Sequence, residues 1–234
     1  MKNLFLTGGS SGIGYSVLQK FSAQNWNIYS TYNNNKLKIK SLKKNFSNVK
    51  FYNLNLYSNS SIDKLTNKIK SNLDGIILNA SDTIFIPISD YKKLTPKLFS
   101  KYVNINLIAQ YRLIYNLIPK LNNKSNIILI SSIASKNGIG SNLAYSCSKA
   151  GINNLAKSLS RVLGGRVQIN CIAPGLMRTN FTTKFTENYF QNYILKTPSK
   201  KLTTPDDIAN IAFSICSSFN NFTGQTIFVD GGVS

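Results

Sequence analysis

A glycine-rich segment stands near the start of the chain, between an apolar run and a helical pattern. Residues 3–6 predict a short strand, and Val17, Leu18 and Phe21 recur at helical spacing. Between them lies Thr7-Gly8-Gly9-Ser10-Ser11-Gly12-Ile13-Gly14. Glycines in such a turn let the backbone approach a pyrophosphate, whose charge the amides at the helix N-terminus then meet. A plain tight turn is the alternative, but the flanking strand and helix favour a dinucleotide site at Gly8, Gly12 and Gly14.

The alternation of strand and helix continues along the chain. Apolar runs predict further strands at 27–32, 49–54, 74–78, 126–130, 166–172 and 226–229. Helical patterns separate them, including one at 103–117 and one that carries Tyr145 and is capped by Gly164-Gly165. Strands that alternate with helices predict a parallel sheet covered on both faces. We therefore expect residues 1–234 to form one Rossmann-type, doubly wound α/β domain with a seven-stranded, mostly parallel sheet.

The end of the second predicted strand lacks an acidic residue. An NAD site commonly has one there, about 20 residues after the glycine loop, to bind the ribose 2′-hydroxyl. Here the segment reads Ser30-Thr31-Tyr32-Asn33-Asn34-Asn35-Lys36, and the first acidic residue of the chain is Asp63. Hydroxyl, amide and ammonium groups would accept a 2′-phosphate without repulsion, so we predict NADPH rather than NADH. The alternative is that Lys36 and Lys38 only solvate a helix face.

The composition excludes several classes of function. The chain has no histidine, so neither a Ser-His-Asp nor a Cys-His mechanism is available. Cys147, Cys171 and Cys216 are widely spaced and form no metal motif, so we expect free thiols in the cytoplasm and no metal site. The net charge of +20 is scattered and accompanies no nucleic-acid motif, which favours an acidic protein or phosphorylated ligand over nucleic acid. No run suits a membrane span or a signal peptide.

Tyr145 and Lys149 stand four residues apart in Tyr145-Ser146-Cys147-Ser148-Lys149, and Ser132 follows the fifth predicted strand. Residues four apart share one face of a helix, so the Lys149 ammonium can lie beside the Tyr145 phenol and lower its pKa. A tyrosine with a pKa below the ordinary value of about 10 can exchange protons near neutral pH. The alternative is an amphipathic helix on which the two side chains merely face the same way.

Several motifs together resemble those of the short-chain dehydrogenase/reductase family, in order and spacing across essentially the whole chain. They are Thr7-Gly8-x-x-x-Gly12-x-Gly14, Asn79-Ala80, Ser132 and Tyr145-x-x-x-Lys149. Pro174-Gly175-Leu176-Met177-Arg178-Thr179 is similar to the family's nicotinamide-side loop, and Asp230-Gly231-Gly232 to its C-terminal signature. Within the family the chain most resembles 3-oxoacyl-[acyl carrier protein] reductases.

The resemblance implies four catalytic residues. Tyr145 would protonate a carbonyl oxygen as hydride arrives, and Ser132 would hold that oxygen. Lys149 would lower the tyrosine pKa and hold the nicotinamide ribose, and Asn106 would anchor a water that relays protons to Lys149. Asn104 is a competing choice for that last role, and a helix-surface amide is the plain alternative for Asn106.

The motifs and the resemblance also imply a set of cofactor contacts. They are Gly8, Ser10, Ser11, Gly12, Ile13, Gly14, Tyr32, Asn33, Lys36, Asn55, Asn79, Ala80, Tyr145, Lys149, Pro174, Gly175, Met177 and Thr179. Asn55 would approach the adenine, Asn79 the adenosine side, and Met177 and Thr179 the nicotinamide carboxamide. Two positions depart from the family pattern. Ser81 replaces a usual glycine, and Ser11 stands where many NADPH-using relatives have arginine, which removes one phosphate contact.

The implied reaction is NADPH-dependent reduction of a carbonyl to a secondary alcohol, with a 3-oxoacyl thioester on acyl carrier protein as the substrate, in fatty acid biosynthesis. Lys124 and Arg161 lie near positions where the resembling reductases present basic residues to that acidic carrier. Segment 180–201 is expected to cover the substrate. Its aromatic residues, for which core packing or a subunit interface is the alternative, are Phe181, Phe185, Tyr189, Phe190 and Tyr193.

Two other functions stay open. The enzyme could act on a small polar alcohol, a sugar or another secondary metabolite, or the chain could be a non-catalytic NADPH-binding regulator. The set of Tyr145, Lys149, Ser132 and Asn106 argues against a regulator. The resemblance further implies a homotetramer in which exposed side chains on two helices pack between subunits, with burial inside one chain as the alternative. These side chains are Leu107, Tyr111, Leu155 and Leu159.

Overall fold

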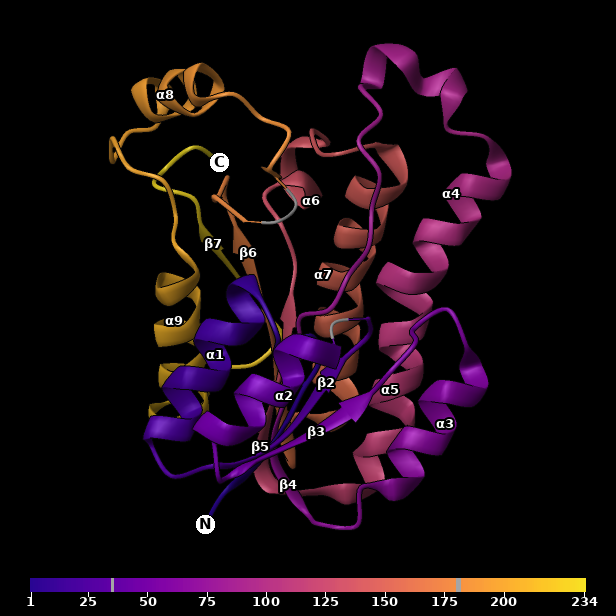
Figure 1. Cartoon of the computed structure of the whole chain (residues 1–234), viewed down its shortest axis with the longest axis vertical. Helices are drawn as coiled ribbons and strands as arrows, with labels where there is room; N and C mark the ends of the chain where they lie inside the picture. Colours follow the sequence, from indigo (N-terminus) through magenta and orange to yellow (C-terminus); the bar gives the residue numbers. More distant parts are fainter. Residues whose placement is uncertain (35, 180–181) are drawn as a thin grey trace.

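Parallel strands form one sheet in the computed structural model, which describes residues 1–34, 36–179 and 182–234 (Figure 1). Within these residues the sheet has seven strands: β1 (Asn3–Leu6), β2 (Asn27–Tyr32), β3 (Val49–Asn53), β4 (Leu73–Leu78), β5 (Leu121–Ile130), β6 (Val167–Pro174) and β7 (Thr226–Val229). Their order is β3-β2-β1-β4-β5-β6-β7, and each neighbouring pair is parallel. The predicted Rossmann-type α/β fold is confirmed, with a sheet that is wholly rather than mostly parallel.

Helices cover both faces of the sheet. They are α1 (Gly12–Ala23), α2 (Lys36–Asn45), α3 (Asn59–Lys68), α4 (Pro96–Val103), α5 (Ala109–Leu117), α6 (Ala134–Asn137), α7 (Leu143–Leu163), α8 (Glu187–Lys196) and α9 (Pro205–Ser218). Short turns of 3-10 helix lie at η1 (Ile88–Lys93) and η3 (Ile118–Lys120), and a π turn at η2 (Asn104–Ile108). In Figure 1, α1 and α9 lie on one side of the sheet, and α4, α5 and α7 on the other. None of the helices in the described ranges has the length and apolar character needed to span a bilayer.

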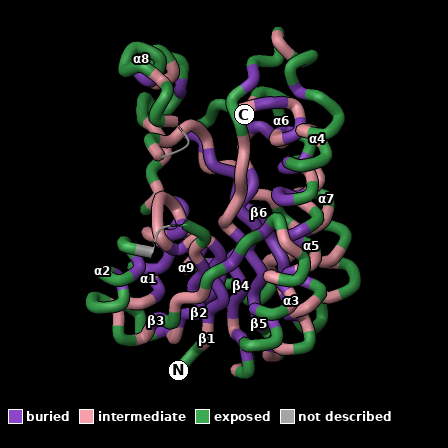
Figure 2. The backbone as a smooth tube through the Cα atoms, turned by 45° about the vertical axis from the view of Figure 1, so that its right-hand side comes forward, coloured by how far each residue is buried: buried purple, intermediate pink, exposed green. Residues whose placement is uncertain are grey.

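Two apolar cores follow from the alternation of side chains along the strands. Leu4 and Leu6 of β1 pack with Phe21 of α1 in one core, which α9 completes. Phe5, between them in sequence, packs with Leu113 of α5 in the other. Figure 2 shows the buried strands between partly exposed helices. Because both faces are covered, the inner strands are apolar at successive positions, as a parallel sheet requires.

The strand order reverses beside β1. The chain passes from β1 to β2 and β3 on one side and then returns to place β4 on the other side of β1. The loops that leave the carboxyl ends of β1 and β4 therefore diverge, and a crevice opens between them. Such a crevice is the usual binding site of an open parallel sheet.

The predicted helix over 103–117 is interrupted by the π turn η2. The amide of Ala109 donates to Asn104 O, five residues back, instead of four. The buried Gln110 amide donates to Ile105 O at 3.2 Å and to Ala80 O at 2.9 Å. Ile105 O belongs to the π turn itself, whereas Ala80 O belongs to the loop after β4, so the Gln110 side chain ties the widened turn to that loop.

One further expectation is confirmed and another needs correction. The helix that carries Tyr145 ends at Leu163, and Gly164 is its C-cap as expected, with φ −55° and ψ −26°. Leu107, Leu155 and Leu159 are partly buried against the core rather than exposed, because α7 packs against α4 and η2 within one chain. Tyr111 is exposed as expected, at 47%.

Candidate active site

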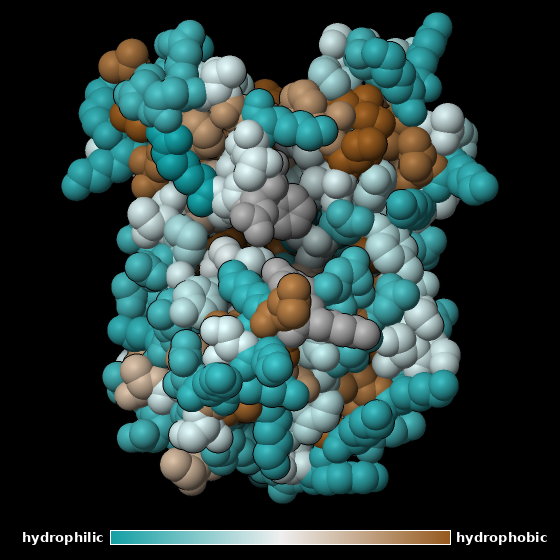
Figure 3. Space-filling model, in the orientation of Figure 1, coloured by the Kyte–Doolittle hydropathy of each residue, from teal (hydrophilic) through white to brown (hydrophobic). Residues whose placement is uncertain are grey.

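A cleft of about 830 Å³ opens at the carboxyl edge of the sheet, where the strand order reverses. Figure 3 shows a hollow near the centre of one face of the molecule. The predicted site residues that line the cleft are Gly8, Ser10, Ser11, Gly12, Ile13, Tyr32, Asn33, Asn79, Ala80, Ser132, Tyr145, Lys149, Pro174, Gly175, Met177 and Thr179. Gly14, Asn55 and Asn106 do not line it. The predicted contact of the Lys36 side chain lies outside the described residues.

The turn after β1 depends on glycine. Gly8 and Gly12 have φ values of +72° and +51°, a region that side chains disfavour. A Cβ on Gly14 would lie 2.1 Å from Gly8 O, so the first turn of α1 lies directly against the loop. Asn79, at the end of β4, donates from Nδ2 to Thr7 O at 3.1 Å. The backbone of this turn is therefore open for close approach by a ligand.

The N-terminus of α1 borders the cleft. Ser10, Ser11 and Gly12 line the cleft there, and the first turn of α1 contains no acidic residue. Ser11 is the N-cap in extended conformation, and its side chain makes no cap hydrogen bond. Backbone amides and the positive end of the helix dipole thus border the cleft with no carboxylate in the first turn of α1, which suits a phosphate group.

The end of β2 offers neutral and cationic groups. Thr31, Tyr32, Asn33 and Asn34 line the cleft together with Lys38 of α2. The Lys38 ammonium lies 5.6 Å from the centre of the Tyr15 ring. A 2′-phosphate at this end would meet amide, hydroxyl and ammonium groups. Lys38, for which solvation of a helix face was the alternative, lines the cleft and is thus a candidate for a phosphate contact.

Ser132, Tyr145 and Lys149 meet at the other end of the cleft. Ser132 follows β5, and the other two lie on successive turns of α7. The Ser132 hydroxyl interacts with the Tyr145 phenol and lowers its pKa in part. The Lys149 ammonium lies 5.5 Å from the centre of the Tyr145 ring and donates to Ile130 O at 2.7 Å. A hydroxyl, a phenol and a cation therefore lie together at this end of the cleft.

Burial shifts the pKa values of both ionisable groups. It raises the pKa of Tyr145, while the hydrogen bond from Ser132 lowers it in part. Burial also lowers the pKa of Lys149 to about 8. The expected lowering of the Tyr145 pKa by Lys149 is not found, because burial raises that pKa, only Ser132 lowers it in part, and the Lys149 ammonium is directed to the Ile130 carbonyl.

Asn106 is buried in the π turn beside the site, at 1% exposure. Its Oδ1 accepts from the Asp82 amide at 2.9 Å, and its Nδ2 donates to Asp82 O at 2.7 Å. Asn104, the competing choice, is exposed. The Asn106 side chain thus holds the segment after β4 in place, and a water relay would have to use other atoms of this turn.

The loop after β6 completes the nicotinamide side expected from the sequence. Pro174 O accepts from the Ile133 amide at 2.9 Å, which ties this loop to the segment of Ser132. Tyr193 of α8 accepts from the Leu176 amide at 3.4 Å. Thr182 also donates to Met177 O at 2.9 Å. The loop is therefore linked both to the catalytic candidates and to the segment that carries α8.

Aromatic side chains of α8 and its approach meet the loop after β4. Phe185 lies 5.7 Å from Phe85 and 4.5 Å from Tyr189, measured between ring centres. Phe190 is buried, whereas Tyr189 is 49% exposed. Phe181 lies outside the described residues. The described rings thus join the segment after β4 to the segment that carries α8.

One contact beside the cleft, between Tyr57 and Asp82, was not predicted from the sequence. Tyr57, after β3, donates a hydrogen bond to the Asp82 carboxylate after β4, and both residues line the cleft. Burial and the neighbouring carboxylate raise the pKa of Tyr57. Leu54 and Leu56 also line the cleft, whereas the Asn55 side chain accepts from the Tyr57 amide in a local turn. The only signal in the sequence is that Asp82 follows the Asn79-Ala80 motif by two positions.

The described residues hold no group of three or more histidine, cysteine, aspartate or glutamate side chains that could bind a metal. Cys147, Cys171 and Cys216 are free, and the last two are buried.

Comparisons with known proteins agree with this geometry. A family model described as Enoyl-(Acyl carrier protein) reductase matches residues 8–234. An uncharacterized oxidoreductase of Bacillus subtilis, YmfI, is 30% identical over 240 residues, covering 99% of this chain and 98% of the relative. The 3-oxoacyl-[acyl-carrier-protein] reductase FabG of Rickettsia typhi is 34% identical over 244 residues, covering 99% and 96%. A solved short-chain dehydrogenase/reductase (glucose/ribitol dehydrogenase) from Brucella melitensis shares the fold, with a TM-score of 0.92 at 23% identity, covering 100% and 96%.

Proposed function

Because the chain belongs to the short-chain dehydrogenase/reductase family, whose members are NAD(P)-dependent oxidoreductases, we propose that it reduces a carbonyl to a secondary alcohol with NADPH. The proposed substrate is a 3-oxoacyl thioester on acyl carrier protein. The observation that carries the proposal is the convergence of Ser132, Tyr145 and Lys149 at one end of a cleft whose other end suits a dinucleotide.

The residues of the cleft fit a dinucleotide. A side chain at Gly14 would collide with Gly8 O, and the positive φ of Gly8 and Gly12 keeps the turn free of side chains. Ser10, Ser11 and the first amides of α1 would hold the pyrophosphate. At the end of β2, Asn33 and Lys38 would accept the 2′-phosphate, which supports NADPH over NADH. When bound, the nicotinamide supplies the hydride.

The chain's own residues supply the proton and the orientation. The Ser132 hydroxyl would hold the substrate carbonyl oxygen, and the Tyr145 phenol would donate its proton to that oxygen. The raised pKa of Tyr145 keeps the phenol protonated at neutral pH, as an acid in the direction of reduction must be. Lys149 would hold the ribose and, while protonated, stabilise the negative charge that develops on Tyr145.

An acyl substrate is supported by aromatic rings close to the cleft. Phe85, Phe185 and Tyr189 do not line the cleft, but Phe85 follows Asp82 by three positions and the Phe185 amide donates to Thr182 O, and both Asp82 and Thr182 line it. The apolar surface of these rings suits a hydrocarbon chain better than a sugar. A small polar alcohol or another metabolite is therefore the second candidate. A non-catalytic regulator would have no use for the paired Tyr145 and Ser132.

Lys124 and Arg161, the basic residues expected to contact the carrier, lie far from the cleft of their own chain. Lys124 precedes Ile130 by six positions on β5, which corresponds to about 20 Å along the strand. Arg161 follows Tyr145 by 16 positions on α7, about 24 Å along the helix. Both lie toward the end of the sheet away from the cleft, so a carrier at the mouth would meet other cations. We keep attraction of an acidic carrier as a proposal that rests on the net charge of +20.

The assembly and location are part of the same proposal. We expect a homotetramer that acts in fatty acid biosynthesis in the cytoplasm. The segment over 180–201 would cover the substrate, as the contact between Phe85 and Phe185 supports.

The test is to measure oxidation of NADPH and NADH in parallel by the purified protein. The substrates are a 3-oxoacyl thioester and an enoyl thioester, each both free and on acyl carrier protein. NADPH-specific turnover of the 3-oxo substrate, faster on the carrier, is the expected result. Tight NADPH binding without turnover of any thioester would remove the substrate class and direct the search to polar carbonyl compounds.

A further inference from the structure

Asn142 lies directly beneath the site at the start of α7. It is the N-cap residue of the helix and is buried, at 1% exposure, so it does not line the cleft. Its Oδ1 accepts from the amide of Tyr145 at 2.9 Å. The same carboxamide donates from Nδ2 to Thr83 Oγ1 at 3.0 Å and to Ile84 O at 2.6 Å. One buried side chain thus joins the backbone of Tyr145 to another segment.

That segment, the 83–86 loop, carries the aromatic side of the substrate end. The Ile86 amide donates to Ser141 O at 2.8 Å, and the hydroxyls of Thr83 and Ser141 are 2.5 Å apart. Phe85, between these contacts, packs edge-on against Phe185 at 5.7 Å. The loop is therefore fastened to the residues just before α7 by several hydrogen bonds, two of which come from the buried Asn142 side chain.

We propose that Asn142 is a positioning residue for the carbonyl reduction. Its carboxamide binds both the first turn of α7 and the 83–86 loop. It therefore fixes the position of the Tyr145 phenol relative to the loop that carries Phe85, which would face the substrate. This inference rests on the proposed function, in which the 83–86 loop contacts the substrate and Tyr145 transfers the proton. The acid must lie within hydrogen-bond reach of the carbonyl oxygen, and a shift of about 1 Å can cost about 100-fold in rate.

The carboxamide is suited to both contacts at once. Serine or aspartate would cap the helix equally well, because each offers an oxygen to the Tyr145 amide. An ionised aspartate has no donor for Ile84 O, and a serine hydroxyl is shorter and has a single donor. Substitutions can therefore separate the cap from the tie to the loop.

The experiment compares Asn142→Ala, Asn142→Ser and Thr204→Ala in the full chain. Asn142→Ala removes both contacts, whereas Asn142→Ser keeps an acceptor for the Tyr145 amide. Thr204→Ala is the matched control, because it removes the side-chain cap of α9, which accepts from the Asp207 amide at 3.2 Å and does not line the cleft. Steady-state rates are measured with NADPH and a 3-oxoacyl thioester, and NADPH binding by its fluorescence.

We expect kcat of Asn142→Ala to fall about 100-fold and its KM for the thioester to rise, with NADPH affinity within about twofold of the wild type. Asn142→Ser should recover most of kcat but keep the raised KM, because the cap returns and the tie to the loop does not. Thr204→Ala should match the wild type. A kcat for Asn142→Ala close to that of Thr204→Ala, or a serine variant as slow as the alanine variant, would overturn the proposal.

A second measurement needs no substrate and so separates this inference from the proposed function. Amide hydrogen exchange is followed at Tyr145 and Ile86 in the NADPH complex. Asn142→Ala should speed exchange at both amides by about 10-fold, and Asn142→Ser only at Ile86. If the wild type reduces no 3-oxoacyl thioester, the proposed function is wrong, but the exchange rates at Tyr145 and Ile86 still test whether Asn142 links the two segments. Unchanged exchange at both amides would refute the coupling, and if Asn142→Ala does not fold, Asn142→Ser alone decides.

Discussion

The ammonium of Lys149 is buried, at 4% exposure, and donates to Ile130 O rather than to the Tyr145 phenol. Its pKa falls to about 8 because burial disfavours the charged form. The pKa of Tyr145 rises for the same reason. The two groups therefore favour a protonated phenol next to a lysine that titrates close to the working range of pH.

The first prediction is the pH dependence of the reduction. Because the folded pKa of Lys149 lies below its ordinary 10.5, the cation is present below about pH 8 and is lost as pH rises through that value. Tyr145, with a raised pKa, stays protonated across the same range. We expect kcat/KM for NADPH-dependent reduction to fall by about 10-fold per pH unit above pH 8. Initial rates between pH 6 and pH 10 would show this, and a level profile up to pH 10 would contradict it.

The second prediction concerns the acid itself. Tyr145→Phe keeps the ring but removes the proton that the carbonyl oxygen must receive. Turnover should fall by about 100-fold to 10,000-fold, with little change in NADPH affinity. Tyr91→Phe, at an exposed tyrosine of η1, is the matched control and should leave turnover unchanged. A Tyr145→Phe variant that retained normal turnover would exclude Tyr145 as the acid.

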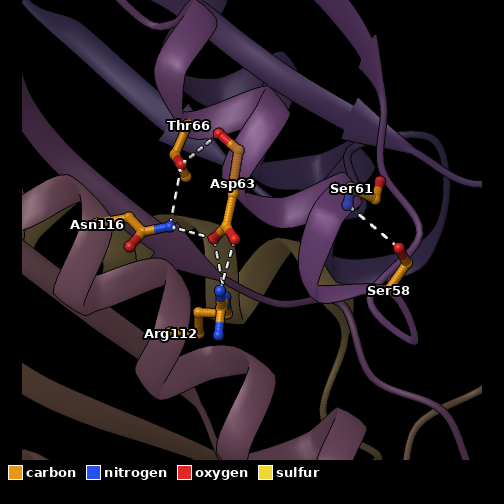
Figure 4. A network of polar contacts seen from close by, with 6 residues as sticks. All are labelled: Ser58, Ser61, Asp63, Thr66, Arg112 and Asn116. Carbon is orange, nitrogen blue, oxygen red and sulfur yellow. Dashed lines mark hydrogen bonds and ion pairs between the residues drawn. The ribbon is translucent and has the colours of Figure 1, made fainter.

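At the scale of elements, α3 and α5 are joined by a polar bridge (Figure 4). The Asp63 carboxylate accepts from Arg112 Nε at 2.8 Å and Nη2 at 2.5 Å, and from Asn116 Nδ2 at 2.9 Å. The hydrogen bonds from Arg112 and Asn116 lower the pKa of Asp63 to about 2. The bridge fixes the outer helix α3 on α5, next to the π turn that holds Asn106.

The third prediction follows from this bridge. Because the folded pKa of Asp63 lies below its ordinary 3.8, the stabilisation is complete above about pH 4 and is lost as pH falls toward 2. Asp63→Asn should lower Tm at pH 7 by no more than about 4 °C, since Asp63 and Arg112 are each 38% exposed and water screens them. The difference from the wild type should shrink below pH 4.

The matched control for this variant is Asp90→Asn. Asp90 pairs with Lys93 three residues later, on the surface of η1, and joins no two helices. Calorimetry should show a smaller change in Tm for Asp90→Asn than for Asp63→Asn at pH 7. Equal changes would mean that the bridge between α3 and α5 contributes nothing beyond local charge.

At the scale of the whole molecule, an apolar stripe runs along the outer face of η2 and α5. Ile108, Tyr111 and Tyr115 are 51%, 47% and 67% exposed and stand at helical spacing. The leucines expected on this surface are partly buried, so the stripe is carried by these three residues instead. Such a surface is what a second copy of the chain could cover.

The fourth prediction is that this stripe lies between subunits. Light scattering should find about four chains in the wild-type particle, as the family resemblance implies. Tyr111→Glu combined with Tyr115→Glu should yield smaller particles, because burying two carboxylates is costly. Leu37→Glu, at an apolar residue of α2 that is 86% exposed, should leave the assembly unchanged. A monomeric wild type would refute the interface.

The fifth prediction concerns the net charge of +20. If the charge steers an acidic carrier, kcat/KM for the carrier-bound substrate should fall about 10-fold as NaCl rises from about 0.05 M to about 0.5 M. A neutral free thioester is the control, and its rate should not change. Equal salt dependence for both substrates would show that the charge plays no part in carrier binding.

Much of the fold was predictable because it depends on local signals. The bounds of β1, β2 and β7 agree with the sequence analysis, since each is a short apolar run with clear flanks. The π turn at Asn104–Ile108 was not predictable, because it arises from buried amides that bind the segment after β4. Asn106 and Gln110 look like ordinary helix residues until that segment is in place.

The sequence alone determined the layers of the fold, the glycine turn and the choice of Ser132, Tyr145 and Lys149, because periodicity, glycine spacing and motif order are written along the chain. The tertiary structure alone decided the pKa values of Tyr145 and Lys149, the contact of Tyr57 with Asp82 and the links of Asn142. Each of these depends on burial or on contact between segments distant in sequence. Desolvation and long-range hydrogen bonds exist only once the chain has folded, so no local pattern encodes them.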